Sequence, residues 1–237
     1  MRLLKLEFLK LRRTLVWPVA LSLPLVPAVM NTVIHHSERF QKAEWADVLQ
    51  NGLNTWHLML MPLVLSLLVA WVLGSEHSGG GWRLNFAAPR PRRSVPYAKM
   101  VLLLFLSLVM ATLMLLSVGL SALSLPSLTG SPDWAAFVWG GLRGWVGSVE
   151  LLLVLFLTAL RFPSFLAPIG LGMAGMVVGF MGINSDSFGP WWPWTFPTLL
   201  SLPGQDGKDL QFPGAVSVVV ALACWALSLQ HVRRQDA

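Results

Sequence analysis

Long, uninterrupted apolar runs divide this sequence of 237 residues, and they constrain its fold more than any other feature. Several approach or exceed the roughly 20 apolar residues that a helix needs to cross a bilayer core of about 30 Å. A helix satisfies its own backbone polar groups in lipid, whereas a transmembrane barrel requires strands of alternating apolar and polar residues. We therefore predict an all-α integral membrane protein, folded as a single transmembrane domain over residues 1–237. The six predicted membrane-spanning helices are residues 14–34, 55–73, 100–123, 134–160, 165–183 and 213–229.

The charged residues support a membrane location. Only 12% of the side chains are charged, about half the fraction in an average soluble domain, and 55% are hydrophobic. The net charge of +6 could indicate a nucleic-acid-binding protein, but the cations flank apolar runs instead of forming a separate basic domain. Residues 1–13 place apolar and basic side chains at helical spacing, which predicts an amphipathic helix in the cytoplasmic membrane interface. The alternative is a basic flank that only sets the orientation.

The distribution of lysine and arginine predicts the orientation. Short loops rich in these residues stay on the cytoplasmic side, and segment 74–99 is such a loop. With that loop inside, both termini are cytoplasmic, and thirteen of the 17 lysines and arginines lie inside against three outside. The outer side then holds residues 184–212, a Trp- and Pro-rich segment that predicts short helices or a re-entrant hairpin. We expect Trp191, Trp192 and Trp194 at the headgroup level, as interfacial anchors or as contacts to a substrate.

Two of the predicted spans carry residues that indicate bending or close packing. Pro18, Pro24 and Pro27 lie within the first span and predict a bent helix. The fifth span contains Gly175 and Gly179, a GxxxG spacing that lets another helix approach closely. We therefore expect the fifth span to pack against a neighbouring helix.

Two charged residues lie inside the fourth predicted span. Arg143 and Glu150 share nearly one helical face but lie about 10 Å apart along the axis, too far for an unaided ion pair. A charge in mid-membrane costs about 2.5–3.5 kcal/mol on insertion scales, so such residues usually face a protein interior or a wet cavity. Glu150 is therefore either part of a substrate path or subunit seam, or an acid bonded to a neighbouring span. For Arg143 we favour a side chain that extends to the outer interface.

The sequence lacks the motifs of several enzyme and metal-binding classes. It has no Gly-x-x-x-x-Gly-Lys-Ser/Thr, so it is not expected to hydrolyse ATP alone, and it has no His-Glu-x-x-His. No cysteine or acid stands at ligand spacing from His35, His36 or His57, so no metal site is predicted. A membrane-embedded enzyme would need several catalytic side chains at span ends, and here Glu150 stands nearly alone. We expect Cys224, the only cysteine, to serve packing.

The loop between the second and third spans carries the most specific pattern. It contains Glu76, Gly81-Trp82-Arg83-Leu84, Ala88-Pro89-Arg90-Pro91-Arg92-Arg93 and Ala98-Lys99. With the basic N-terminal helix, the six spans and the Trp- and Pro-rich segment, this pattern resembles the permease subunits of type 2 ABC exporters. Among these, it is most similar to the bacterial lantibiotic-immunity and bacitracin-resistance permeases.

That resemblance implies a short coupling helix in this loop, which docks into a groove of a separate nucleotide-binding subunit. The matching residues here are Glu76, Trp82, Arg83, Arg90, Arg92, Arg93 and Lys99. The three glycines at 79–81 depart from the family pattern and leave the start of the coupling helix open. A buriable aromatic side chain beside a charge, as in Trp82 and Arg83, suits such a docking contact.

The function implied by the resemblance is ATP-driven export across a bacterial cytoplasmic membrane. Two permease chains, identical or homologous, would bind two ATPase subunits that hold ATP and magnesium, while this chain binds no cofactor itself. The substrate would be amphipathic, such as an antimicrobial peptide, a drug or a lipid-like molecule, moved out of the membrane or the cell. The alternative is a membrane assembly or structural subunit that does not transport; a membrane-embedded enzyme fits less well.

Overall fold

A computed structural model of the chain describes residues 2–36, 43–78, 91, 94–125, 128–202 and 211–234. Within these residues the chain is helical and has no β-strand beyond a single bridge between Glu44 and Thr129. The prediction of an all-α membrane protein is therefore confirmed. The elements are α1 (Arg2–Leu11), α2 (Val16–Ser22), η1 (Leu23–Leu25), α3 (Val26–His36), α4 (Trp45–Asn54), η3 (Thr55–Leu60), α5 (Met61–Ser78), α7 (Ser94–Leu123), α8 (Trp134–Arg161), α9 (Leu166–Gly182), η4 (Gly189–Trp191), α10 (Phe196–Ser201) and α11 (Gln211–Arg234).

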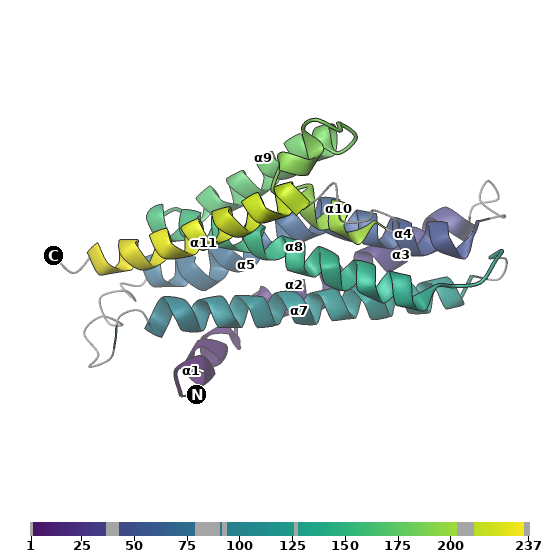
Figure 1. Cartoon of the computed structure of the whole chain (residues 1–237). Coiled ribbons are helices and arrows are strands. Elements are labelled where there is room, and N and C mark those ends of the chain that lie inside the picture. Colours follow the sequence, from purple (N-terminus) through teal and green to yellow (C-terminus); the bar gives the residue numbers. More distant parts are fainter. Residues whose placement is uncertain are drawn as a thin grey trace.

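The helices run side by side in an elongated bundle, shown in Figure 1. In the part of the chain that the structure describes, five stretches are long and apolar enough to cross a membrane: Val16–His35, Trp45–Glu76, Ser94–Leu123, Trp134–Arg161 and Gly214–Val232. The apolar helix α9 has 17 residues, which reach about 26 Å at 1.5 Å per residue, slightly less than a bilayer core of about 30 Å. The sixth crossing and the cytoplasmic position of both termini stay predictions.

The first predicted span is interrupted at its prolines. The helix α2 gives way to the 3-10 turn η1, and α3 follows without a gap. Pro24 and Pro27 lack the backbone N–H that an α-helix uses inside its hydrogen-bond ladder, so a regular helix cannot continue through them. Ser117 of α7 donates a hydrogen bond of 3.0 Å to the carbonyl oxygen of Pro24. A neighbouring helix thereby bonds one of the carbonyl groups at this irregular turn.

The second helical series begins earlier than predicted. The second span is predicted to begin at residue 55, but residues Trp45–Asn54 already form the helix α4. Val48, Leu49 and Leu53 of α4 are buried at helical spacing, so the polar residues that suggested a loop form the opposite face of a helix. The series then passes through η3, a π-helical stretch that ends at Leu60, two residues before Pro62, which also lacks a backbone N–H.

The predicted basic loop 74–99 is shorter in the structure. The helix α5 continues through Ser78 and α7 begins at Ser94, so Glu76 and Lys99 lie on helices instead of in the loop. In Figure 1, α1, the end of α5, the start of α7 and the end of α11 lie at the same end of the bundle. We name this the loop end.

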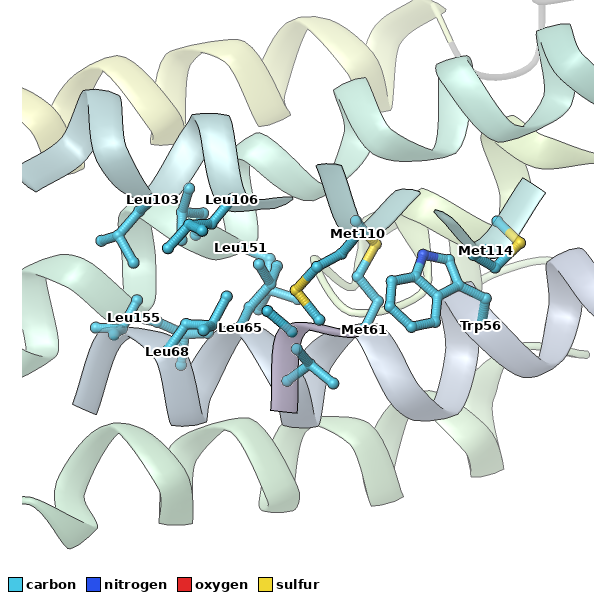
Figure 2. Packing of buried hydrophobic residues seen from close by; sticks show 14 of the residues in the cluster. Trp56, Met61, Leu65, Leu68, Leu103, Leu106, Met110, Met114, Leu151 and Leu155 are labelled. Atoms are coloured by element: carbon cyan, nitrogen blue, oxygen red, sulfur yellow. The ribbon is translucent and has the colours of Figure 1, made fainter. Parts of the chain in front are cut away.

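The hydrophobic core lies between α5, α7 and α8. Figure 2 shows leucines of these three helices meeting, with Trp56, Met110 and Met114 packed at one end of the cluster. All of these side chains are buried. Because lipid tails are as apolar as leucine, close packing of such side chains is the main stabilising contribution between membrane helices.

The glycines of α9 accommodate a helix and two tryptophans. Gly172 packs against Ser66 of α5, as expected for a glycine-rich span, whereas Gly175 packs against the indole of Trp194. Trp194 Nε1 donates a hydrogen bond of 3.2 Å to the carbonyl of Gly172, and Trp192 Nε1 donates one of 3.0 Å to that of Gly175. Trp194 is only 4% exposed. It is therefore a packing residue within the bundle, and its position at the headgroup level stays a prediction.

The two other tryptophans of this segment are more accessible. Trp192 is half-buried and stacks on Trp194 with ring centroids 5.4 Å apart. Trp191 is 51% exposed. An interfacial or substrate-contacting role stays a prediction for both.

The short helix α10 follows these tryptophans and lies inside the bundle. Most of its side chains are buried, and it packs against a glycine face of α8. A Cβ atom on Gly140 would lie 2.7 Å from the carbonyl oxygen of Ser201, and one on Gly147 would lie 3.2 Å from Cα of Pro197. The absence of side chains at these positions lets the irregular segment approach α8, where protein covers its backbone.

Replacing Gly175 with alanine should destabilise the protein. The new Cβ would lie 2.1 Å from Cε2 of Trp194, so the rigid indole must shift, which costs about 1–3 kcal/mol. The midpoint of thermal unfolding in detergent should fall. Gly170→Ala is the matched control on the same helix, because a Cβ there meets nothing within 4 Å. Equal midpoints for the two variants would contradict the close contact of Trp194 with α9.

Candidate functional site

Four charged side chains meet at the loop end of the bundle. Glu7 and Lys10 come from α1, Glu76 from the end of α5 and Lys99 from the start of α7. Lys99 Nζ lies 2.7 Å from Glu7 Oε2 and 2.9 Å from Glu76 Oε1. Lys10 Nζ lies 2.9 Å from Glu7 Oε1 and 2.7 Å from Glu76 Oε1. Each ammonium group therefore contacts both carboxylates, and we name these four residues the ionic cluster.

Three members of the ionic cluster are buried. The side chains of Lys99, Glu7 and Glu76 are 1%, 2% and 4% exposed, whereas that of Lys10 is 43% exposed. Two positive and two negative charges cancel, so the cluster enters the interior without net charge. Lys99 also donates a hydrogen bond of 3.0 Å to the carbonyl of Val72. Its ammonium group thus has three acceptors, one for each of its protons.

Local helical geometry places the α1 members of the cluster. Glu7 and Lys10 are three residues apart, a spacing that puts both side chains on one face of α1. Phe8, between them in sequence, contacts the rings of Trp17 and Phe105 with centroids 6.0 and 5.6 Å apart. These aromatic contacts hold α1 against the bundle while its charged face joins the cluster.

Lys10 is charged at neutral pH although it is partly buried. Burial alone would lower the pKa of Lys10, but hydrogen bonds to Glu76 and Glu7 outweigh this effect and raise that pKa. A raised pKa means that the stabilisation by charged Lys10 is fully present at neutral pH and is lost only as the pH rises through the lysine range. Lys10 therefore contributes its positive charge to the ionic cluster under ordinary conditions.

The ionic cluster joins α1 to the two helices that border residues 79–93. Glu76 precedes this connection and Lys99 follows it, and each is paired inside the cluster. Sequence reasoning assigned both residues to contact with an ATPase subunit. Their buried side chains are engaged within the chain, which suits positioning of the connection better than contact with a separate protein. The other predicted coupling residues, Trp82, Arg83, Arg90, Arg92 and Arg93, lie outside the described residues.

The sequence analysis did not identify Glu7 as a member of a charged cluster, although its position on α1 indicated a buried acid. Glu7 is the acid in an otherwise basic amphipathic helix, and it lies one helical turn from Leu4 and Leu11. An acid on the apolar face of a helix is costly to bury unless a cation or a hydrogen-bond donor accompanies it. Lys99 was available for that role, but the sequence alone does not indicate which cation meets which acid.

A third buried acid, Glu150, lies within α8, apart from the ionic cluster. It is 5% exposed and accepts a hydrogen bond from the hydroxyl group of Ser217 in α11. A bond to a neighbouring helix is one of the two arrangements expected for this acid. Arg143 of the same helix is exposed, and within the described ranges it forms no ion pair with Glu150. An interfacial position for Arg143 stays a prediction.

His57 is a buried polar residue whose position the sequence did not reveal. It belongs to η3, its side chain is fully buried, and neither ring nitrogen has a hydrogen-bond partner in the described part of the chain. A Cβ atom on Gly144 would lie 2.4 Å from its Nε2. The available signal was the spacing of Gly140, Gly144 and Gly147, which puts three glycines on one face of α8.

Comparison with known protein families decides the class of the chain. The profile of the ABC-2 family transporter protein matches residues 3–179, about three quarters of the chain. The chain belongs to this family. As an ABC-2 family member it is a multi-pass, non-catalytic permease subunit of an ABC transporter, and it works with a partner ATPase subunit. No curated protein and no solved structure matches the chain significantly.

The family match covers the ionic cluster and Glu150 but not Ser217. It includes α1, the ionic cluster and most of α9, whereas α10 and α11 lie beyond it. The ionic cluster is therefore part of the ABC-2 region. The contact of Glu150 with Ser217 joins that region to the C-terminal helix.

Replacing Lys99 with methionine should strongly destabilise the permease at its loop end. The change leaves two buried carboxylates opposite one lysine, and breaking a buried ion pair in this way costs about 3–5 kcal/mol. The midpoint of thermal unfolding should fall, and hydrogen exchange of the α1 amides should accelerate. Lys5→Met on the exposed face of α1 is the control and should change little.

A double variant tests whether the members of the ionic cluster act together. Adding Glu7→Gln to Lys99→Met restores equal numbers of positive and negative charges, with Lys10 opposite Glu76. Stability should recover in part relative to Lys99→Met alone, since contacting residues are coupled. Strictly additive losses would show that the four residues do not form one unit.

Proposed function

We propose that this chain is the permease subunit of an ATP-driven ABC exporter that moves an amphipathic substrate out of the membrane or the cell. The ionic cluster carries the proposal. It ties both ends of the connection 79–93 to each other and to α1, so a force on the connection acts on three helices at once. A partner ATPase subunit that holds ATP and magnesium would supply that force. Its proposed contacts are Trp82 and Arg83, followed by Arg90, Arg92 and Arg93.

The proposed transporter contains two permease chains, identical or homologous, in a bacterial cytoplasmic membrane. The basic residues of α1 and of the connection 79–93 favour a cytoplasmic loop end. With α9 as a short sixth crossing, both termini are cytoplasmic. The sequence resemblance supports the lantibiotic-immunity and bacitracin-resistance branch, and hence an antimicrobial peptide, a drug or a lipid-like molecule as substrate.

The ATPase contact can be tested by purification of the tagged chain from its host membranes in mild detergent. A soluble ATPase subunit should accompany the chain in equal amount. It should be lost when Trp82→Ala and Arg83→Glu are combined, because these changes remove the proposed aromatic anchor and reverse its neighbouring charge. The thermal unfolding midpoint should not change, since the ionic cluster is intact.

The matched control reverses a charge in the connection between α3 and α4, with Lys42→Glu. This variant should retain the ATPase. If no ATPase accompanies the wild-type chain under several gentle conditions, the coupling proposal fails, and an assembly or structural subunit becomes the better description.

The proposed orientation predicts which side of the membrane each connection faces. In a Cys224→Ser background, Asp209→Cys should react with a membrane-impermeant maleimide in intact cells. Gly80→Cys should react only after the membrane is permeabilised. The opposite pattern would contradict a cytoplasmic loop end. Protection of both cysteines in intact cells would show that α9 does not cross.

A further inference from the structure

Two neighbouring cavities lie along α7 and α11, and we name them together the groove. The first, of about 370 Å³, is lined by Glu150 and Ser217 together with apolar side chains of α7, α8 and α11. The second, of about 580 Å³, lies nearer the loop end and includes side chains of α1. Tyr97, Val101 and Trp225 line both cavities. The groove therefore extends from α1 at the loop end to the buried acid of α8.

Several side chains of α11 that line the groove are exposed, although α11 packs along α8. Among the described side chains of α11, only Ser217, Ser228 and Val232 are buried. Val218 and Leu222 line the groove and are 59% and 63% exposed. A molecule dissolved in the surrounding lipid can reach the groove past these side chains.

The groove is lined by apolar and aromatic side chains and by a single acid, Glu150. Glu150 accepts a hydrogen bond from Ser217, but within the described residues no lysine or arginine lies at ion-pair distance from it. A carboxylate at such a depth is costly unless a cation accompanies it. Tyr97 and Trp225, with ring centroids 6.2 Å apart, add aromatic faces that attract cations. Ser94 Oγ, buried and without a partner in the described chain, supplies a further polar atom in the second cavity.

We propose that this groove binds a membrane-dissolved amphiphile with one positive charge. The cationic group lies beside Glu150 and Ser217, and the apolar part lies along the aromatic and aliphatic walls. This inference rests on the proposed function, because it names the substrate class of the exporter. A phospholipid acyl chain would fill the groove but leave the acid without a cation. A second permease copy that packed against the groove through its own α11 would also leave Glu150 without a cation, since Gly214–Val232 contains no lysine or arginine.

The test measures binding of two matched probes to the full chain in phosphatidylcholine nanodiscs. Radiolabelled dodecyltrimethylammonium carries the charge, and dodecyldimethylphosphine oxide has a similar shape without net charge. The cation should bind saturably and more tightly than the neutral probe. Glu150→Gln keeps the shape and the acceptor for Ser217 but removes the charge, so it should weaken cation binding by about tenfold or more and leave the neutral probe unaffected.

Three further variants keep the result interpretable. Asp186→Asn removes one exposed acid elsewhere and should not alter binding. Glu150→Asp retains the charge and should preserve the preference for the cation, which separates charge from folding. Ala221→Phe should block both probes by filling the groove, in which Ala221 lies.

The outcomes separate this proposal from the proposed function. Equal binding of the two probes, unaffected by Glu150→Gln, would overturn it and identify an apolar lipid seat. Absence of saturable binding would also overturn it, and a cross-link between Leu222→Cys residues of two chains would then assign the face to a second permease copy. Because binding needs no ATPase, a chain that binds the cation but carries no ATPase would contradict only the coupling proposal.

Discussion

A charged side chain can be buried in a membrane protein only when other groups neutralise it and satisfy its hydrogen bonds. The ionic cluster meets both conditions for Lys99, with two carboxylates and one backbone carbonyl as acceptors. Glu7 supplies one of those carboxylates, so α1 is a structural part of the loop end. The start of the ABC-2 match at residue 3 agrees with this, because it includes the whole contribution of α1.

A second constraint is the need to cover irregular backbone inside a membrane bundle. Glycine-lined faces on two helices, α8 and α9, satisfy this constraint. The face of α8 admits α10 and the imidazole of His57, and the face of α9 admits the indole of Trp194. Each approach is too close for a Cβ atom, so the positions of the glycines decide where the Trp- and Pro-rich segment can enter. The segment is therefore as firmly specified by glycines on other helices as by its own tryptophans and prolines.

The sequence was sufficient for properties that depend on runs and periods. Apolar length predicted the helices, and the basic flanks identified the loop that the ionic cluster borders. Contacts between distant residues were not accessible in the same way. Periodicity shows that Glu7 lies on the apolar face of α1 but does not indicate that Lys99 is its partner. Likewise, clustered tryptophans favour an interface on average, but the space left by Gly175 gives Trp194 a buried site.

The predicted helix boundaries were wrong for a related physical reason. In α4 the buried residues occupy one face only, so the polar face dominates the local composition and suggests a loop. Local composition is misleading in the same way at both ends of the basic loop, where it suggests that Glu76 and Lys99 are charges facing solvent. They lie on helices, and their side chains can be buried because their charges cancel across helices. Local composition contains no information on such pairs.

The first turns of α7 connect the ionic cluster with the groove. Lys99 faces the cluster, while Tyr97 and Val101, two residues before and after it, line both cavities of the groove. A helix transmits displacement along its length because its backbone hydrogen bonds keep neighbouring turns together. A force on residues 79–93 that shifted the start of α7 would therefore move one wall of the groove. The opposite wall, α11, contributes no residue to the ionic cluster. The two walls would then move by different amounts, which is how a force applied outside the membrane could change the width of a binding site within it.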